Sequence, residues 1–161
     1  MRWRVKALIQ KGISILPFHR QVHHFLQERV FKSLQLSNFF VADRLSHVAK
    51  HLDAWQQIHP GTFPQKSMEL GTGWFPIVPI GMYLSGWGEI STVDQHPLLK
   101  AKAFRQTVDY LKDLAQAGKL HAYLHSLQAD RWKKLQEVSA QSSLQTWLAA
   151  VNLQYAVTDA R

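Results

Sequence analysis

The chain has 161 residues, 46% of them hydrophobic and 19% charged, which is enough apolar material for a packed core and excludes a chain that is disordered throughout. It has no cysteine and no apolar run of the roughly 18 residues that span a membrane, so the sequence offers no disulfide, no thiolate metal site and no membrane-spanning helix. The net charge is +8, and five basic residues precede the first acidic residue, Glu28, so an argument for nucleic-acid binding rests on that segment alone.

Residues 1–60 are predicted to form a helical N-terminal extension. Apolar residues at helical spacing predict a helix that Pro17 ends, a second helix over 19–34, and a third over 38–58 that Ser37 or Asn38 caps. We expect the basic first helix to pack on the rest of the protein with a solvated basic face. The alternative is peripheral contact with a membrane, a nucleic acid or an acidic partner, although the signal for nucleic acid is not strong.

Residues 61–161 show a different pattern, in which short strands alternate with helices. Turn residues at 60, 61 and 64 separate this part from the extension. The predicted elements are strands at 67–70, 89–93 and 153–158, a short helix that ends at 84, and helical stretches at 100–117 and 129–150. Strands that alternate with helices in this way imply right-handed crossovers and a parallel sheet, so the predicted fold class is α/β.

Chemistry-bearing residues lie where each predicted strand ends. Glu69 and the loop Gly71-Thr72-Gly73 end the first strand, Asp94 ends the second, and Asp159 ends the third. Ligands of parallel sheets bind beyond the carboxyl ends of the strands, and glycine lets backbone N–H groups approach them closely. Asp94 lies 25 residues beyond Glu69, which suits the spacing of roughly 20 residues in a nucleotide-binding unit, and an acid at this strand end is placed to accept hydrogen bonds from a ribose diol. This pattern predicts a ligand that contains adenosine.

The residues around the glycine loop resemble those of a known enzyme family. Glu69-Leu70-Gly71-Thr72-Gly73 resembles the E/D-x-G-x-G motif of class I S-adenosylmethionine-dependent methyltransferases. Val93-Asp94 is similar to the family's ribose-binding motif, and residues 155–160 are similar to its adenine-binding motif. A dinucleotide fold would carry glycine or alanine where this chain has Pro76, which disfavours an oxidoreductase that uses a nicotinamide cofactor.

The resemblance implies a role for each matching residue. Glu69 would contact the methionine amino group, and the glycine loop would wrap the methionine and ribose. Asp94 would bind the ribose hydroxyls, Asp159 would accept from the adenine amino group, and the Ala160 N–H would meet a ring nitrogen. The complete set of predicted cofactor-binding residues is Glu69, Gly71, Thr72, Gly73, Asp94, Gln95, Asp159 and Ala160.

The chain also departs from the family pattern. Phe75 stands where many members have a third glycine, and the long stretch between Asp94 and Leu153 predicts a helical insertion at about 100–150. The family's sheet continues beyond three strands. We therefore expect a Rossmann-like three-layer methyltransferase fold of which this chain supplies only the N-terminal part, truncated after its third strand, with the catalytic residues unassigned.

The resulting hypothesis is the S-adenosylmethionine-binding portion of a methyltransferase that acts on a small-molecule acceptor in the cytoplasm. The alternative is a non-catalytic helical interaction protein on a degenerate methyltransferase scaffold. Because a three-stranded sheet leaves an edge exposed, we also expect self-association or pairing with the missing half. The histidine pairs His47/His51 and His121/His125 lack the glutamate of an H-E-x-x-H zinc site, so no metal is predicted.

Overall fold

The computed structural model describes residues 36–158. The chain divides into two compact units, Met1–Gln35 and Leu36–Arg161, and only the second contains described residues. The two helices predicted before residue 35, with their basic segment, therefore lie outside the described residues, as do Asp159 and Ala160.

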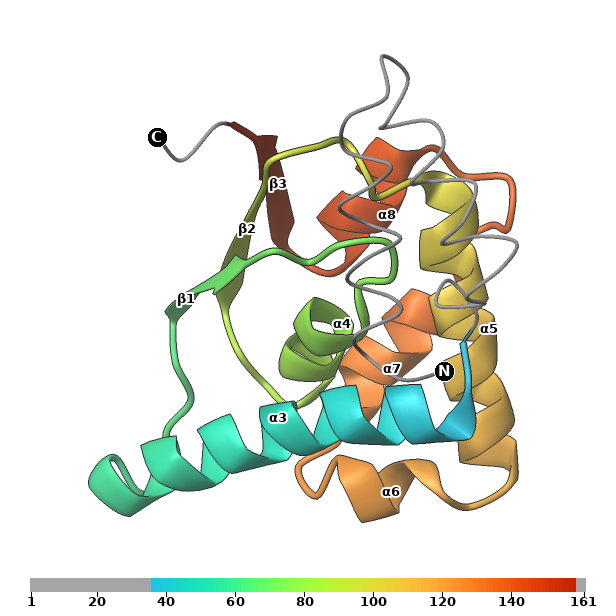
Figure 1. The fold of residues 1–161 in the computed structure, drawn as a ribbon. Helices are drawn as coiled ribbons and strands as arrows, with labels where there is room; N and C mark the ends of the chain where they lie inside the picture. The colour runs from blue at the N-terminus through green and yellow to red at the C-terminus, as the bar shows by residue number, and fades with distance from the viewer. Residues whose placement is uncertain (1–35, 159–161) are drawn as a thin grey trace, which may run out of the picture. The chain divides into compact units, whose positions relative to one another are not determined.

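Three parallel strands form the sheet, with β2 in its centre (Figure 1). They are β1 (Lys66–Leu70), β2 (Glu89–Asp94) and β3 (Leu153–Val157). The register places Leu70 beside Val93 and Val93 beside Ala156, so the carboxyl ends of all three strands lie at the same end of the sheet. The predicted strands, the parallel sheet and the α/β class are confirmed.

The described helices that connect the strands cover one face of the sheet (Figure 1). On β2, Ile90, Thr92 and Asp94 point into this helical side and are buried, while the alternate residues are half-exposed. Successive right-handed crossovers in one direction place every connecting helix on the same side. The described residues therefore form two layers, and the third layer of the predicted fold is not among them. We call the uncovered side the outer face; its side chains are those of Lys66, Met68, Leu70, Glu89, Ser91, Val93, Gln154 and Ala156.

Helix α3 (Asn38–Ile58) begins where the sequence predicts, because the Ser37 hydroxyl accepts a hydrogen bond from the Phe40 N–H at 3.2 Å. Its buried side chains, Val41, Leu45, Val48 and Leu52, recur at helical spacing. They pack on α4 (Ile77–Leu84), which is buried along its whole length. The prediction placed α3 in an extension that ends at residue 60, whereas in the structure α3 shares one core and one compact unit with the sheet.

The predicted insertion at about 100–150 forms four helices: α5 (Ala101–Gln116), α6 (Leu120–Tyr123), α7 (Ala129–Gln136) and α8 (Leu144–Ala150). The prediction of a single helix over 129–150 is wrong, because the mostly polar segment 137–143 separates α7 from α8. The Ser143 hydroxyl then starts α8 by accepting from the Thr146 N–H at 3.2 Å. Trp147 of α8 stacks on Phe104 of α5, with ring centroids 5.4 Å apart, so the insertion builds the core of the helical side.

The hydropathy of the described helices bears on membrane association. Across residues 36–158, no helix combines the length and the apolar character needed to cross a membrane.

Substitution of two glycines by alanine tests how closely the main chain and the helices are packed at these positions. A Cβ atom on Gly88, just before β2, would lie 2.3 Å from the carbonyl oxygen of Gln65, just before β1. The main chain at the start of one of these two strands would have to move. We expect Gly88→Ala to lower the free energy of unfolding by about 1–3 kcal/mol, the usual cost of overpacking. Urea unfolding of the native and variant chains measures this loss.

Gly81→Ala is the matched control. Its Cβ would meet the ends of the Val48 and Leu45 side chains at 3.0–3.1 Å, and alanine regains about 1 kcal/mol of helix propensity. We expect this variant to cost less than Gly88→Ala. Equal losses would show that main-chain crowding at Gly88 is not the limiting contact.

Candidate functional site

The glycine loop follows β1 and turns away from the sheet. Gly71 and Gly73 have φ angles of 81° and 70°, in the left-handed region that glycine adopts without strain. The Gly71 N–H still donates to the Val93 carbonyl at 2.9 Å, so the loop starts from the last rung of the β1–β2 ladder. Among residues 36–158, apart from each glycine's own chain neighbours, no atom lies within 4 Å of a Cβ built on either glycine, which leaves room for a ligand to approach the main chain.

Glu69 is held by a chain of hydroxyl groups. The Thr72 hydroxyl donates to Glu69 Oε2 at 2.6 Å and also contacts the hydroxyl of Thr92, which is buried on β2 directly beside Glu69. A hydroxyl has one proton, so if Thr72 donates to Glu69 it must accept from Thr92. The Thr92–Thr72–Glu69 chain fixes the orientation of the carboxylate and ties the loop to the centre of the sheet.

The charge state of Glu69 reflects opposing influences. Burial raises the pKa of its carboxyl above the ordinary value, the Thr72 hydrogen bond lowers it, the neighbouring Asp94 carboxylate raises it, and the Arg44 guanidinium lowers it. Together these influences raise the pKa of Glu69. Arg44 belongs to α3, where it lies 5.3 Å from the centroid of the Phe40 ring. No sequence signal indicates a cation from α3 near the loop, because only the packing of α3 against α4 brings it there.

Asp94 ends β2, as predicted, and is buried with 6% of its surface exposed. Both carboxylate oxygens accept the Gly73 N–H, each at 3.2 Å. Asp94 thus closes the glycine loop over the end of β2, instead of presenting a free carboxylate to solvent. The structure brings together the two acids and the loop predicted from the sequence. Each acid, however, already accepts a hydrogen bond from the loop: Glu69 from Thr72 and Asp94 from Gly73.

Tyr155 of β3 lies within the predicted adenine-binding motif, but the sequence argument assigned it no role. It lies beside Thr92 in the register and points to the same side of the sheet. Its hydroxyl accepts the Leu99 N–H at 3.4 Å and donates to the His96 carbonyl at 3.2 Å, so it anchors the segment that follows Asp94. Burial raises the pKa of the Tyr155 phenol, the Leu99 N–H lowers it, and Asp94 raises it. The alternation of β3 could have indicated that Tyr155 faces the site.

The remaining predicted residues divide into two groups. Thr72 is half-buried between Glu69 and Thr92, and Gln95 is exposed just beyond Asp94. Asp159 and Ala160 lie outside the described residues. The residue before them, Thr158, donates its N–H to the Asp94 carbonyl at 3.0 Å, so the β2–β3 ladder continues to the last described residue.

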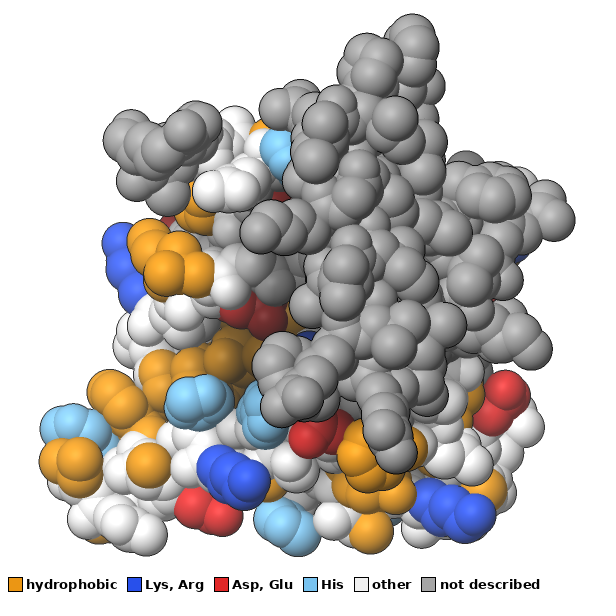
Figure 2. Space-filling model, viewed as in Figure 1, with side chains coloured by type: hydrophobic (Ala, Val, Ile, Leu, Met, Phe, Trp, Pro, Cys, Tyr) orange, Lys and Arg blue, Asp and Glu red, His pale blue; other side chains and the backbone are white. Residues whose placement is uncertain are grey.

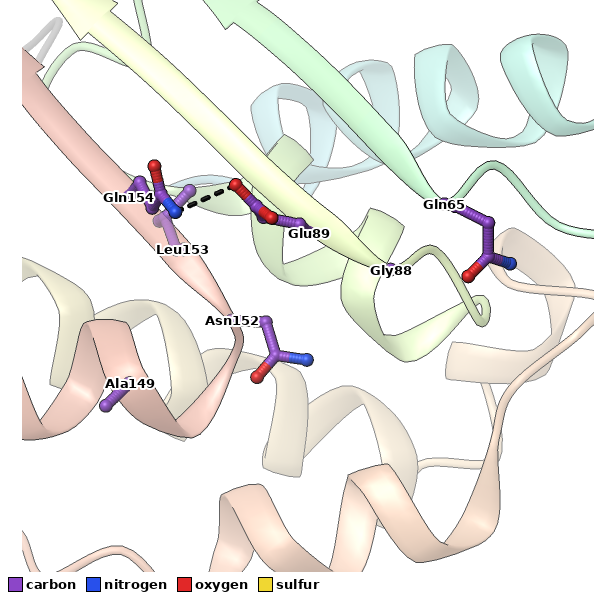
Figure 3. Close-up of a pocket in the computed structure, with 7 residues that line it drawn as sticks. All are labelled: Gln65, Gly88, Glu89, Ala149, Asn152, Leu153 and Gln154. Carbon is purple, nitrogen blue, oxygen red and sulfur yellow. Dashed lines mark hydrogen bonds between the residues drawn. The ribbon is translucent and has the colours of Figure 1, made fainter.

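A cavity of about 500 Å³ lies at the opposite end of the sheet. It is open and polar, and it is formed where the strands begin (Figure 3). Gln154 donates to Glu89 across it at 2.8 Å. The lining residues are Gln65, Gly88, Glu89, Ala149, Asn152, Leu153 and Gln154. This cavity shares no residue with the predicted site, and the sequence argument did not identify it.

The histidine pairs do not build a metal site with other ligands. Within residues 36–158, no three side chains of the types His, Cys, Asp and Glu gather closely enough to hold a metal ion. His47 instead lies 3.9 Å from Asp43, one turn earlier on α3.

Comparisons with known proteins do not assign the chain to a family: no family model, no curated protein and no solved structure matches it. The methyltransferase resemblance therefore stays a prediction from the motifs, and a functional assignment depends on the geometry of the site.

The raised pKa of Glu69 predicts a pH-dependent change in stability. A raised pKa means that the folded chain binds the proton more tightly than the unfolded chain does. This stabilisation is complete below the ordinary pKa of 4.5 and is lost as the pH rises through the folded-state pKa. We expect Glu69→Gln to be more stable than the native chain at neutral pH, with the difference growing from about pH 4.5 upward and then levelling. Urea unfolding across this range measures it.

Thr72→Val is a second variant for this experiment, because it removes the hydroxyl whose hydrogen bond lowers the pKa of Glu69. The pH range over which stability is lost should extend upward in this variant. A Glu69→Gln chain that is less stable than the native chain at every pH would show that the hydrogen bond outweighs the cost of burying the carboxylate.

Proposed function

We propose that the chain binds S-adenosylmethionine at the carboxyl ends of β1 and β2 and serves as the cofactor-binding portion of a methyltransferase that acts on a small-molecule acceptor. The main support for the proposal is that Glu69, the Gly71–Gly73 loop and Asp94 lie together at the carboxyl end of the sheet. The open space over both glycines supports it, because the cofactor needs close contact with the main chain there.

Glu69 suits the methionine end of this cofactor. Its carboxylate would accept the ammonium group, while Thr72 keeps the second oxygen in place. An ammonium that binds Glu69 would also offset the burial that raises the pKa of this carboxyl in the ligand-free chain.

Asp94 suits the ribose, but only after a local exchange of hydrogen-bond donors. Its oxygens now accept the Gly73 N–H, and the ribose hydroxyls would replace that donor. Gly73 would then be released toward the ligand, which its positive φ and open surroundings allow. Binding therefore includes a movement of the glycine loop away from Asp94.

The cofactor supplies an electrophilic methyl group, and its in-line transfer depends mainly on positioning. In this proposal Glu69 and Asp94 are positioning residues that hold the cofactor. No residue of this chain is assigned to the acceptor or to proton transfer.

A non-catalytic interaction protein on the same scaffold is the second candidate. The observation that favours it is that Asp94 is buried and already satisfied by Gly73, as in a loop that binds nothing. The two candidates differ in one respect that can be measured, which is whether the folded chain binds the cofactor.

Calorimetric titration tests the proposal directly. We expect saturable binding of S-adenosylmethionine and S-adenosylhomocysteine, without competition from NAD. Asp94→Asn keeps an acceptor for the Gly73 N–H but loses the charge, so it should weaken both ligands by at least about tenfold, or ~1.4 kcal/mol. The absence of binding by a chain that circular dichroism shows to be folded would favour the interaction protein.

Gln154→Ala is the control for location, because it changes the cavity at the other end of the sheet. We expect its affinities to match those of the native chain. If this variant weakens binding while Asp94→Asn does not, then the cavity, and not the glycine loop, holds the ligand.

The pH dependence of affinity tests the role of Glu69. The ammonium prefers the ionised carboxylate, and the pKa of Glu69 is raised, so affinity for S-adenosylmethionine should increase with pH and level off above that pKa. Titrations at a series of pH values below the range in which an amino group deprotonates measure the trend. Glu69→Gln should bind weakly at every pH, and a native affinity that does not change with pH would remove Glu69 from the ammonium site.

A further inference from the structure

Thr92 is a buried polar residue on the central strand of the sheet. Its side chain lies on the helical side of β2, where it is 1% exposed, and Glu69 is its partner on β1 in the register. A buried hydroxyl group needs a hydrogen-bond partner, and the hydroxyl of Thr92 contacts that of Thr72 in the glycine loop. Thr92 is too deeply buried to meet a ligand, so its influence on the site passes through Thr72.

The first half of the glycine loop is tied to both strands. The Gly71 N–H donates to the Val93 carbonyl at 2.9 Å. The Thr72 hydroxyl donates to Glu69 at 2.6 Å and accepts from Thr92, so its single proton points at the carboxylate. A hydroxyl that accepts one hydrogen bond donates more strongly in the next, because linked hydrogen bonds polarise one another. Thr92 therefore strengthens the bond that Glu69 receives.

The second half of the loop is held differently. The Gly73 N–H is shared between the two oxygens of Asp94 at 3.2 Å each, which is the long end of the normal range for such a bond. The ligand proposed above has to displace this N–H. Gly73 has a positive φ and no Cβ, so it can change its backbone conformation at low cost while Thr72 stays bonded.

The surroundings of Glu69 show why a fixed donor matters. Burial and the Asp94 carboxylate on β2 raise the pKa of Glu69, whereas the Thr72 hydrogen bond and, to a smaller extent, the Arg44 guanidinium on α3 lower it. Acidic side chains are visible in a hollow between β1 and α3 in Figure 2. A loop that moved as a whole would remove the Thr72 bond when the ammonium group of the ligand requires an ionised carboxylate.

We propose that Thr92 is a positioning residue of the ligand site. Through Thr72 it keeps the carboxylate of Glu69 oriented for the ammonium group. Gly73 meanwhile moves away from Asp94, so the hinge of the loop lies between Thr72 and Gly73. This inference rests on the proposed function, because that function requires Gly73 to release Asp94.

Thr92→Val tests this role, because valine has the shape of threonine without the hydroxyl. Thr107→Val is the matched control: Thr107 is also 1% exposed, and its hydroxyl donates to the Ala103 carbonyl at 2.9 Å within α5. NMR titration of the ligand-free chains follows the carboxyl carbon of Glu69. We expect its pKa to rise in Thr92→Val, to stay unchanged in Thr107→Val and to be restored in Thr92→Ser. A native pKa in Thr92→Val would contradict the inference.

Calorimetric titration separates this inference from the proposed function. We expect Thr92→Val to weaken S-adenosylhomocysteine by about threefold to tenfold, the effect of one hydrogen bond. Methylthioadenosine, which lacks the ammonium group, should bind this variant and the native chain alike. A native chain that binds neither ligand would overturn the proposed function and this inference with it. If the native chain binds both, and Thr92→Val weakens neither or weakens both equally, the proposed function stands and the role of Thr92 is wrong.

Hydrogen exchange of the native chain tests the hinge without a substitution. When S-adenosylhomocysteine is bound, the Gly71 N–H should stay as protected as in the ligand-free chain, because its bond to Val93 persists. The exchange rate of the Gly73 N–H should change, because its acceptor does. Loss of protection at Gly71 on binding would show that the whole loop moves and that no hinge lies after Thr72.

Discussion

The parallel pairing of β2 with both of its neighbours positions the site residues and the core. It places the ends of β1 and β2 side by side, so Glu69 and Asp94, which are far apart along the chain, reach the same loop. The pairing also makes β2 alternate strictly between buried and half-exposed residues. The buried set, Ile90, Thr92 and Asp94, joins the apolar core to the polar site along one strand. Where β2 begins, the Gly88 N–H donates to the Pro64 carbonyl and the Glu89 N–H to the Gln65 carbonyl, each at 2.8 Å, so the two strands start side by side.

The polar site illustrates how buried carboxyl groups are tolerated. Asp94 is satisfied by the Gly73 N–H, while Glu69 relies on one hydroxyl and on the more distant charge of Arg44. Burial without full compensation raises the pKa of Glu69 and makes the site less stable than an apolar replacement would be. Such a cost is typical of groups retained for a ligand, and it connects the electrostatics of the folded chain to the proposed function.

The outer face of the sheet contrasts with the helical side. Helices α3 to α8 supply one well-packed core, in which Trp147 and Phe104 are the largest fully buried side chains. On the outer face, Met68 and Leu70 remain exposed, with 67% and 78% of their surface accessible.

Local patterns in the sequence specify most of the helices and strands and the residues that end them. Apolar periodicity and the Ser37 cap specify α3, short apolar runs between turn residues specify the strands, and glycine at 71 and 73 specifies a loop with left-handed backbone. These signals act over a few residues, so they can be read without the fold. The cap at Ser143, which begins α8 and breaks residues 129–150, is another local signal. Only tertiary packing brings α3 into the sheet's core, brings Arg44 and Tyr155 to the site, and bonds Asp94 to the loop instead of leaving it to face solvent. Each of these depends on contacts between segments distant in sequence, and the burial and charge they produce exist only once those segments are packed together.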